Sequence, residues 1–230
     1  MELSIVVPFY NEGANVLTVL EKAVRVLDSS NISYELIAVD NGSVDSTGEF
    51  IDRIVASSDR VRKVRVERNR GYGFGIRQGL DCCRGDIVGY MWGDDQISSD
   101  VLPLLLQKLR NERLHLCKVV RVVRTESFVR RFLSFLYNRV VMNAFFMIVS
   151  DDINGCPKIM PRTVYKRLRV SSNDWFIDPE ILMKCKRKKF KVGEIPVTPI
   201  ERALGGSHVR WSTCVEFFWN ILYYALIGRR

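Results

Sequence analysis

The first half of the chain alternates between two hydrophobic patterns. Short apolar runs rich in β-branched residues stop abruptly at polar residues, as buried strands do. Longer segments carry apolar residues at helical spacing, for example from Val16 to Leu27. The short runs predict four strands, at Leu3–Val7, Glu35–Val39, Val61–Val66 and Ile87–Met91. Strands that alternate with helices predict an α/β domain with a doubly wound, mostly parallel sheet and right-handed crossovers.

Local signals place two of the helices. Ser46 and Glu49 stand at the spacing of a capping box and predict the start of a helix. The leucine-rich segment Asp100–Arg110 predicts another.

After Leu114 the pattern changes. His115–Val123 is typical of one more strand, and Phe128–Val149 is a long helical stretch whose internal charges argue against a membrane-spanning segment. The aromatic segment Val215–Ile227, followed by two arginines, is too short to span a bilayer. Both segments suit amphipathic helices at a membrane interface, but ordinary core or a dimer face explains them equally well.

Polar residues follow each of the four predicted strands. These ends are Pro8–Glu12, Val39–Gly42, Glu67–Arg70 and Trp92–Gln96. Because ligands bind beyond the carboxyl ends of parallel strands, we expect the four ends to meet at one crevice. Asp94, Asp95 and Gln96 offer the oxygen ligands that Mg²⁺ and Mn²⁺ prefer, above all when a diphosphate supplies the rest. The alternative is a polar turn that caps the next helix.

The glycine series that begins at Gly71 and ends at Gly79 does not fit a dinucleotide fingerprint. It follows the third strand instead of the first, and its spacing is GxGxG. One interpretation is a flexible turn with close contact between a helix and the sheet. The other is that backbone N–H groups and a helix N-terminus approach a phosphate.

Composition limits the protein class. The 230 residues suit one α/β domain with appendages, and the net charge of +9 favours anionic partners such as phosphorylated substrates, anionic lipid or nucleic acid. The basic run Lys184–Lys191 suits a solvated helix end or contact with anionic headgroups. Six cysteines without zinc spacing and only two histidines predict reduced cytosolic thiols. The start on a strand predicts no signal peptide, and no nucleic-acid-binding motif is present.

The motifs VPFYNE, VDNGSVDST, RNRGYGFG and GDDQ closely resemble those of the inverting family-2 glycosyltransferases of the GT-A fold. The segments DDINGCPKIMPR, WFIDPEIL and EIPVTPIERALGGSH extend the resemblance to His208. The last is similar to polyprenyl-phosphate glycosyltransferases of the dolichyl-phosphate mannose synthase kind. The resemblance implies a GT-A domain over residues 1–210, with a nucleotide-binding half (1–112) and an acceptor half (113–210). Residues 211–230 then form a C-terminal amphipathic helix.

The resemblance also implies roles for individual residues. The nucleotide-sugar donor would contact Pro8, Tyr10, Glu12, Val39, Asp40, Asn41, Gly93, Asp94, Arg124, Arg202 and His208. Asp94 and Gln96 would hold Mg²⁺ or Mn²⁺. Asp152, Arg162, Glu180 and Ser207 would lie on the acceptor side. Asp94, Asp95 and Asp178 are the catalytic candidates.

Three departures from the family pattern stand out. Trp92 occupies the position of the first aspartate of the usual D-x-D, so one metal ligand is missing. Either Asp95 substitutes for it, or the metal relies on Asp94, Gln96 and phosphate oxygens. Asn41 replaces the second aspartate of the usual DDG at the base site, and His208 replaces a lysine.

The implied reaction is an in-line displacement at the anomeric carbon of a nucleotide sugar. A lipid-phosphate acceptor is already nucleophilic at neutral pH and needs no strong base. A sugar hydroxyl would need one, and Asp178 or Asp174 are the candidates. A cytoplasmic protein peripheral to a membrane is expected, and a homo-oligomer stays open. The competing class is a nucleotide-binding or scaffold relative that lost turnover with the acid at position 92.

Overall fold

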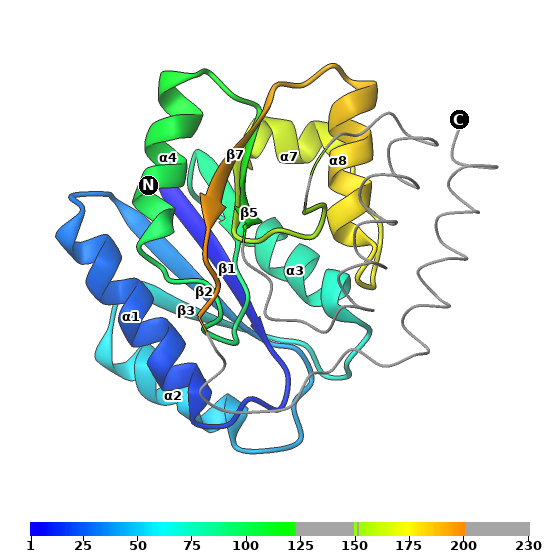
Figure 1. The fold of residues 1–230 in the computed structure, drawn as a ribbon. Coiled ribbons are helices and arrows are strands. Elements are labelled where there is room, and N and C mark those ends of the chain that lie inside the picture. The colour runs from blue at the N-terminus through cyan, green and yellow to red at the C-terminus, as the bar shows by residue number, and fades with distance from the viewer. Residues whose placement is uncertain (123–149, 151, 201–230) are drawn as a thin grey trace.

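The computed structural model describes residues 1–122, 150 and 152–200. Its seven-stranded sheet has the order β3-β2-β1-β4-β6-β5-β7 (Figure 1). The strands are β1 (Leu3–Phe9), β2 (Tyr34–Asp40), β3 (Val61–Arg65), β4 (Ile87–Tyr90), β5 (Leu116–Arg121), β6 (Lys158–Pro161) and β7 (Val192–Val197). The four strands predicted in the first half of the chain are confirmed.

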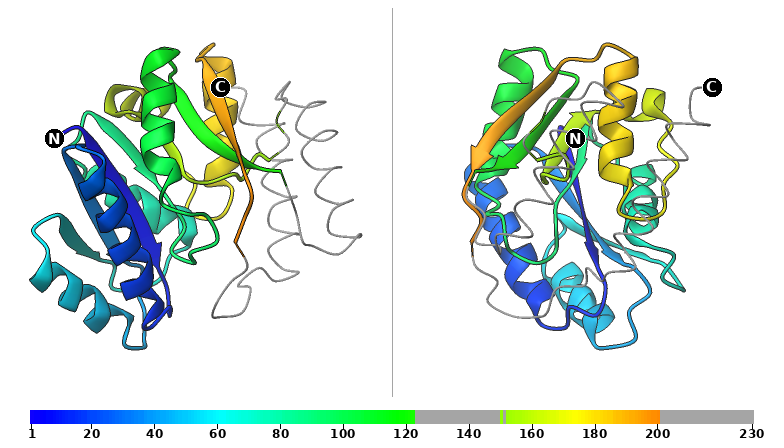
Figure 2. Two further views of the ribbon diagram at one scale, coloured as in Figure 1. Left: turned by 60° about the vertical axis from the view of Figure 1, so that its left-hand side comes forward. Right: turned by 45° about the vertical axis from the view of Figure 1, so that its right-hand side comes forward.

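Helices cover both faces of the sheet (Figure 2). One face packs against α1 (Asn15–Ser29), α2 (Thr47–Ser57) and α4 (Val101–Asn111). The other packs against α3 (Tyr72–Asp81), α7 (Arg162–Leu168) and α8 (Ile177–Arg187). Each face has its own cluster of buried apolar residues, so the predicted α/β architecture is confirmed. Among the helices that the structure describes, none is both long and apolar enough to cross a bilayer.

Strand direction decides where functional residues gather. β1 pairs in parallel with β2 and β4, and β2 pairs in parallel with β3. β6 runs antiparallel to both β4 and β5, so β5 has the same direction as β4, and β7 is parallel to β5. Six of these seven strands therefore end at one edge of the sheet, which we call the carboxyl edge.

Several boundaries differ from the predicted ones. β1 continues through Pro8 to Phe9. Proline lacks an N–H group, but no ladder hydrogen bond to β4 is lost, because β4 pairs with β1 only as far as Val6. β5 ends at Arg121 instead of Val123. The strands β6 and β7 and the helix α7 were not predicted.

The predicted capping box is wrong. The Ser46 side chain makes no capping hydrogen bond, and Asp45 Oδ1 instead accepts a bond from the Thr47 N–H at 3.0 Å. The predicted helix nevertheless starts there, as α2.

The glycine series allows close packing. A Cβ on Gly79 would lie 2.4 Å from Val6 Cγ1, so α3 lies directly on β1. A Cβ on Gly71 would lie 2.3 Å from the carbonyl oxygen of Asn173, which also accepts a hydrogen bond from the Phe74 N–H. The close-contact interpretation is therefore confirmed. In the first turn of α3, the Phe74 N–H donates to a protein carbonyl.

We predict that Gly79→Ala destabilises the protein. Alanine stabilises an exposed helix by about 1 kcal/mol relative to glycine, but here the added methyl group would overlap Val6, and such overpacking costs about 1–3 kcal/mol. Urea denaturation should therefore show a lower free energy of unfolding. The control is Gln78→Ala on the same helix, where the side chain is partly exposed. Equal or higher stability of Gly79→Ala would contradict the packing.

Candidate functional site

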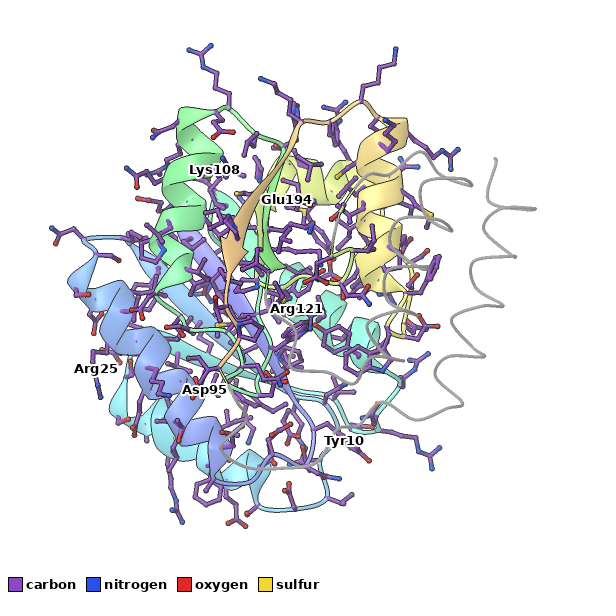
Figure 3. All side chains as sticks on the ribbon, in the orientation of Figure 1. Tyr10, Arg25, Asp95, Lys108, Arg121 and Glu194 are labelled. Atoms are coloured by element: carbon purple, nitrogen blue, oxygen red, sulfur yellow. The ribbon has the colours of Figure 1, made fainter. Side chains whose placement is uncertain are left out.

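Side chains from several separate loops meet at the carboxyl edge. The Asn15 amide donates hydrogen bonds to Glu12 Oε2 at 3.2 Å and to the Gly93 carbonyl at 3.0 Å. The Asn41 N–H donates to the Phe9 carbonyl at 2.9 Å. The loops after β1, β2 and β4 are therefore joined, and these are three of the four strand ends that the sequence predicted to meet. Figure 3 labels Tyr10, Asp95 and Arg121, which come from the ends of β1, β4 and β5.

The loop after β1 is held by the start of α2. Thr47 Oγ1 accepts hydrogen bonds from the N–H groups of Glu12 and Gly13, each at 2.9 Å. These bonds fix the backbone beside Tyr10, whose side chain remains exposed. The loop therefore presents Tyr10 and Glu12 on a rigid support. Pro8 and Val39 lie in the strands themselves, as register partners.

The two polar residues that end β2 have different surroundings. Asp40 is buried, and its Oδ1 accepts a hydrogen bond from the Ser43 N–H at 2.9 Å, so this carboxylate stabilises the turn. Asn41 Nδ2 donates to the Gly71 carbonyl at 3.0 Å. Asn41 Oδ1 is buried and has no hydrogen-bond partner among the described residues. An unsatisfied buried acceptor costs about 1–3 kcal/mol, which suggests a donor supplied by a ligand.

The two carboxylates of the acidic turn after β4 have different partners. Asp94 Oδ1 accepts a hydrogen bond from the Gln96 N–H at 3.2 Å. Asp95 has a left-handed backbone with φ of 57° and forms an ion pair with Lys22 on α1. Asp95 is therefore directed to α1, and its predicted role as the substitute metal ligand does not fit. Within the described ranges, no group of three or more His, Cys, Asp or Glu side chains could hold a metal.

An aromatic cluster lies beside this turn. Trp92 packs against the apolar clusters of both faces, and its indole Nε1 is buried without a hydrogen-bond partner among the described residues. The ring of Tyr72, at the start of α3, stacks on Trp175 with centroids 4.2 Å apart. Burial raises the pKa of Tyr72 well above its ordinary value, with nearby Cys156 and Asp178 adding to the rise. The phenol therefore stays neutral.

Asp178 is enclosed in the interior. Its Oδ1 accepts hydrogen bonds from the Tyr90 hydroxyl at 2.6 Å and from Lys158 Nζ at 2.5 Å. Burial raises the pKa of Tyr90, and the charge of Asp178 adds to that rise. A general base must accept a proton from the substrate, and here Lys158 and Tyr90 occupy one carboxylate oxygen of a buried side chain. Asp174 Oδ1 accepts a hydrogen bond from the Phe176 N–H at 2.8 Å, next to the start of α8.

The three acceptor-side candidates that the structure describes, Asp152, Arg162 and Glu180, are not gathered in one place. Asp152 lies at the carboxyl edge and binds Arg121 through both carboxylate oxygens. Arg162 starts α7 after Pro161, which pairs with Ile87 at the opposite edge of the sheet. The structure thus separates Arg162 from the other site residues, because β6 runs antiparallel.

Glu180 is fully buried beneath the segment before α8. Its carboxylate accepts hydrogen bonds from the N–H groups of Ser171 at 3.0 Å and Ser172 at 2.8 Å, and it pairs with Lys184 at 2.6 Å. Burial alone would raise the pKa of Glu180, but the bonds from Lys184 and Ser172 outweigh it, so the pKa lies below its usual value. This carboxylate holds the 171–172 backbone.

Arg121 was missed from the sequence. The predicted strand ran past it to Val123, which hid the fact that a cation ends β5 at the carboxyl edge. The only signal was a basic residue near the end of an apolar run. Arg124, Arg202, Ser207 and His208 lie outside the described residues, as do the segments Phe128–Val149 and Val215–Ile227.

Comparison with known proteins gives one consistent result. The family described as "Glycosyl transferase family 2" matches residues 4–169. Undecaprenyl-phosphate 4-deoxy-4-formamido-L-arabinose transferase of Shewanella sediminis is 32% identical over 155 residues, covering 67% of this chain and 46% of that protein. Dolichyl-phosphate beta-glucosyltransferase of Dictyostelium discoideum is 25% identical over 215 residues, covering 85% and 65%. The chain thus spans about half to two thirds of these relatives.

A solved structure shows the same fold. Glucosyl-3-phosphoglycerate synthase from Mycobacterium tuberculosis, in complex with Mn²⁺, uridine diphosphate and phosphoglyceric acid, superposes with a TM-score of 0.67. The sequences are 20% identical, and the match covers 99% of this chain and 78% of the other. The predicted GT-A fold is therefore confirmed.

We predict that Glu180→Gln lowers the free energy of unfolding by about 2 kcal/mol at pH 7, because charge-assisted hydrogen bonds inside the protein are lost. Since the pKa of Glu180 is lowered on folding, its contribution is present above the ordinary value of 4.5 and disappears as the pH falls through the folded pKa. The difference between wild type and variant should therefore shrink in acid.

Urea denaturation from pH 7 into acid measures this difference. Glu67→Gln is the control, because Glu67 is exposed. Wild-type stability of Glu180→Gln together with a loss of activity would instead favour the acceptor-side role.

Proposed function

Since the chain belongs to glycosyl transferase family 2, we propose that it transfers a sugar from a nucleotide-sugar donor to a polyprenyl-type lipid phosphate, with inversion. Two relatives are named for transfer involving undecaprenyl phosphate and dolichyl phosphate, which supports this class of acceptor. The observation that carries the proposal is the buried Oδ1 of Asn41, which has no hydrogen-bond partner among the described residues. It lies at the carboxyl edge, where the loops after β1, β2 and β4 are joined.

The nucleotide is proposed to bind across the ends of β1 and β2. Asn41 Oδ1 would accept a hydrogen bond from the N–H of uracil or guanine, since both bases present such a donor. Tyr10 is exposed beside it, and Glu12 is held through Asn15 next to Gly93. The base and ribose would therefore lie over Pro8, Val39 and Asn41, and the diphosphate would point toward the turn after β4.

A divalent cation would bind at Asp94 and Gln96. Mg²⁺ commonly uses one or two carboxylates and takes its other ligands from water and substrate phosphates. One carboxylate with an adjacent amide fits an ion that arrives on the diphosphate, and the related solved structure contains Mn²⁺. When bound, such an ion neutralises charge on the leaving nucleoside diphosphate. The chain does not offer a second carboxylate at position 92.

The acceptor phosphate would attack the anomeric carbon directly. A phosphate monoester is largely ionised at neutral pH, since its second pKa is about 6, so no strong base is needed. The enclosure of Asp178 by Lys158 and Tyr90 agrees with a reaction that uses no base at this position. The chain's task is then to orient two anionic substrates and to stabilise the leaving group.

Trp92 supports one competing function, a nucleotide-binding subunit without turnover. A tryptophan cannot ligate a metal, so the catalytic ion has one carboxylate fewer.

A sugar hydroxyl is the alternative acceptor, and Asp174 would then be the candidate base because Asp178 is enclosed. A peripheral position at the cytoplasmic face of a membrane follows from the proposed lipid acceptor.

We predict that Asp94→Ala reduces sugar transfer at least 100-fold, because transition-state charge stabilisation of this kind is worth roughly 10²–10³ in rate. Transfer from UDP- and GDP-sugars to a short polyprenyl phosphate, with Mn²⁺ or Mg²⁺, measures the effect. Asp86→Ala is the matched control, because Asp86 is an exposed carboxylate at the other end of β4. No transfer by the wild type from any donor, despite nucleotide binding, would favour the non-catalytic alternative.

A further inference from the structure

Arg121 lies at the carboxyl edge, next to the acidic turn after β4. It is the last residue of β5, whose direction matches that of β4 because β6 lies antiparallel between them. The guanidinium carbon lies 4.9 Å from the ring centroid of Trp92, two residues before Asp94. The guanidinium of Arg121 therefore lies beside the turn that carries Asp94 and Gln96, which are proposed to bind the metal ion of the diphosphate.

Asp152 fixes the guanidinium through its N–H groups. Arg121 Nε donates to Asp152 Oδ2 at 2.7 Å, and Nη2 donates to Oδ1 at 2.8 Å. The backbone N–H of Arg121 also donates to Oδ2 at 3.1 Å. A bidentate pair sets the plane of the guanidinium, and the indole face of Trp92 packs over it. The side chain thus loses little further conformational freedom when it binds a ligand.

The exposed end of this pair is the cation. The Asp152 side chain is 2% exposed, whereas that of Arg121 is 21% exposed. An approaching ligand therefore meets the guanidinium, while the carboxylate stays inside. Arginine suits phosphate oxygens because its planar N–H groups match their geometry.

The identity of residue 92 controls the charge next to Arg121. A carboxylate at position 92, as the family pattern has, would lie beside the guanidinium and cancel part of its charge. Tryptophan covers the guanidinium face with a neutral ring, so the positive charge is retained. The same substitution that removes a metal ligand thus leaves a fixed cation at this edge.

We propose that Arg121, which packs on Trp92 and pairs with Asp152, binds the diphosphate of the donor and supplies charge neutralisation that a second metal-binding carboxylate would otherwise support. The inference rests on the proposed function, since it assumes a nucleoside diphosphate at this edge. It makes donor binding less dependent on a divalent cation. The nucleoside diphosphate should bind even when metal is removed.

Calorimetric titration with UDP and GDP, in EDTA and in Mn²⁺, tests this proposal. The variant is Arg121→Met combined with Asp152→Asn, which removes both charges and leaves no carboxylate buried alone. It should bind the preferred diphosphate at least tenfold more weakly than the wild type in EDTA. Its affinity for the corresponding nucleoside, measured by ligand-detected NMR, should stay unchanged, because the nucleoside has no phosphate.

Two further variants complete the test. Arg121→Lys keeps the charge without the planar fork, so it should bind in EDTA with an affinity between those of the wild type and the double variant. Arg53→Met is the matched control, because Arg53 also lies 4.9 Å from an aromatic centroid, that of Phe50 on α2, and should bind like the wild type.

Three outcomes would overturn the role of Arg121. They are wild-type affinity of both Arg121 variants in EDTA, an equal loss of nucleoside and diphosphate binding in the double variant, and complete loss of wild-type diphosphate binding in EDTA. If the wild type binds neither UDP nor GDP with or without Mn²⁺, the proposed function itself fails.

Discussion

Parallel pairing at the centre of the sheet is the constraint on which the site depends. β1 pairs with β2 over its full length from Leu3 to Phe9, but with β4 only from Leu3 to Val6. Because the neighbours of β1 end at different heights, the chain after Tyr90 leaves the sheet before β1 does. The turn that carries Asp94 therefore faces the loops after β1 and β2. The polar residues of these loops lie beyond the paired part of the sheet, where a ligand can bind.

The second half of the sheet depends on charges buried within it. Lys118 and Lys158 are direct partners in the β5–β6 ladder, and both are fully buried. Burial lowers the pKa of Lys118, and the neighbouring Lys158 adds to the effect. Glu194 pairs with Lys118 at 2.9 Å and Asp178 pairs with Lys158. Buried charges of this kind require close partners, because removing one partner of a buried ion pair destabilises a protein by about 3–5 kcal/mol.

These buried charges also shape the chemistry at the edge. Lys118 Nζ donates to the Asp152 carbonyl at 2.7 Å, so the backbone of the residue that anchors Arg121 is itself fixed by a buried lysine. Lys158 donates to the Gly155 carbonyl at 2.6 Å and thereby supports the same segment. The proposed site would bind two anionic substrates and would therefore require rigid cations, and the interior ion pairs of this chain supply such rigidity.

The sequence alone determined the elements whose signals are local. Strong apolar runs specified β1 to β4, and their polar ends placed Glu12, Asn41 and Asp94 at one edge, because strand direction in alternating α/β units follows from chain connectivity. Only the tertiary structure decided the rest. The antiparallel insertion of β6 sent Arg162 to the far edge and brought Arg121 to the site, and no local pattern encodes the order of strands. The partners of Asp95 and Asp178 were also decided by the tertiary structure, because Lys22 and Lys158 are distant from these carboxylates in sequence.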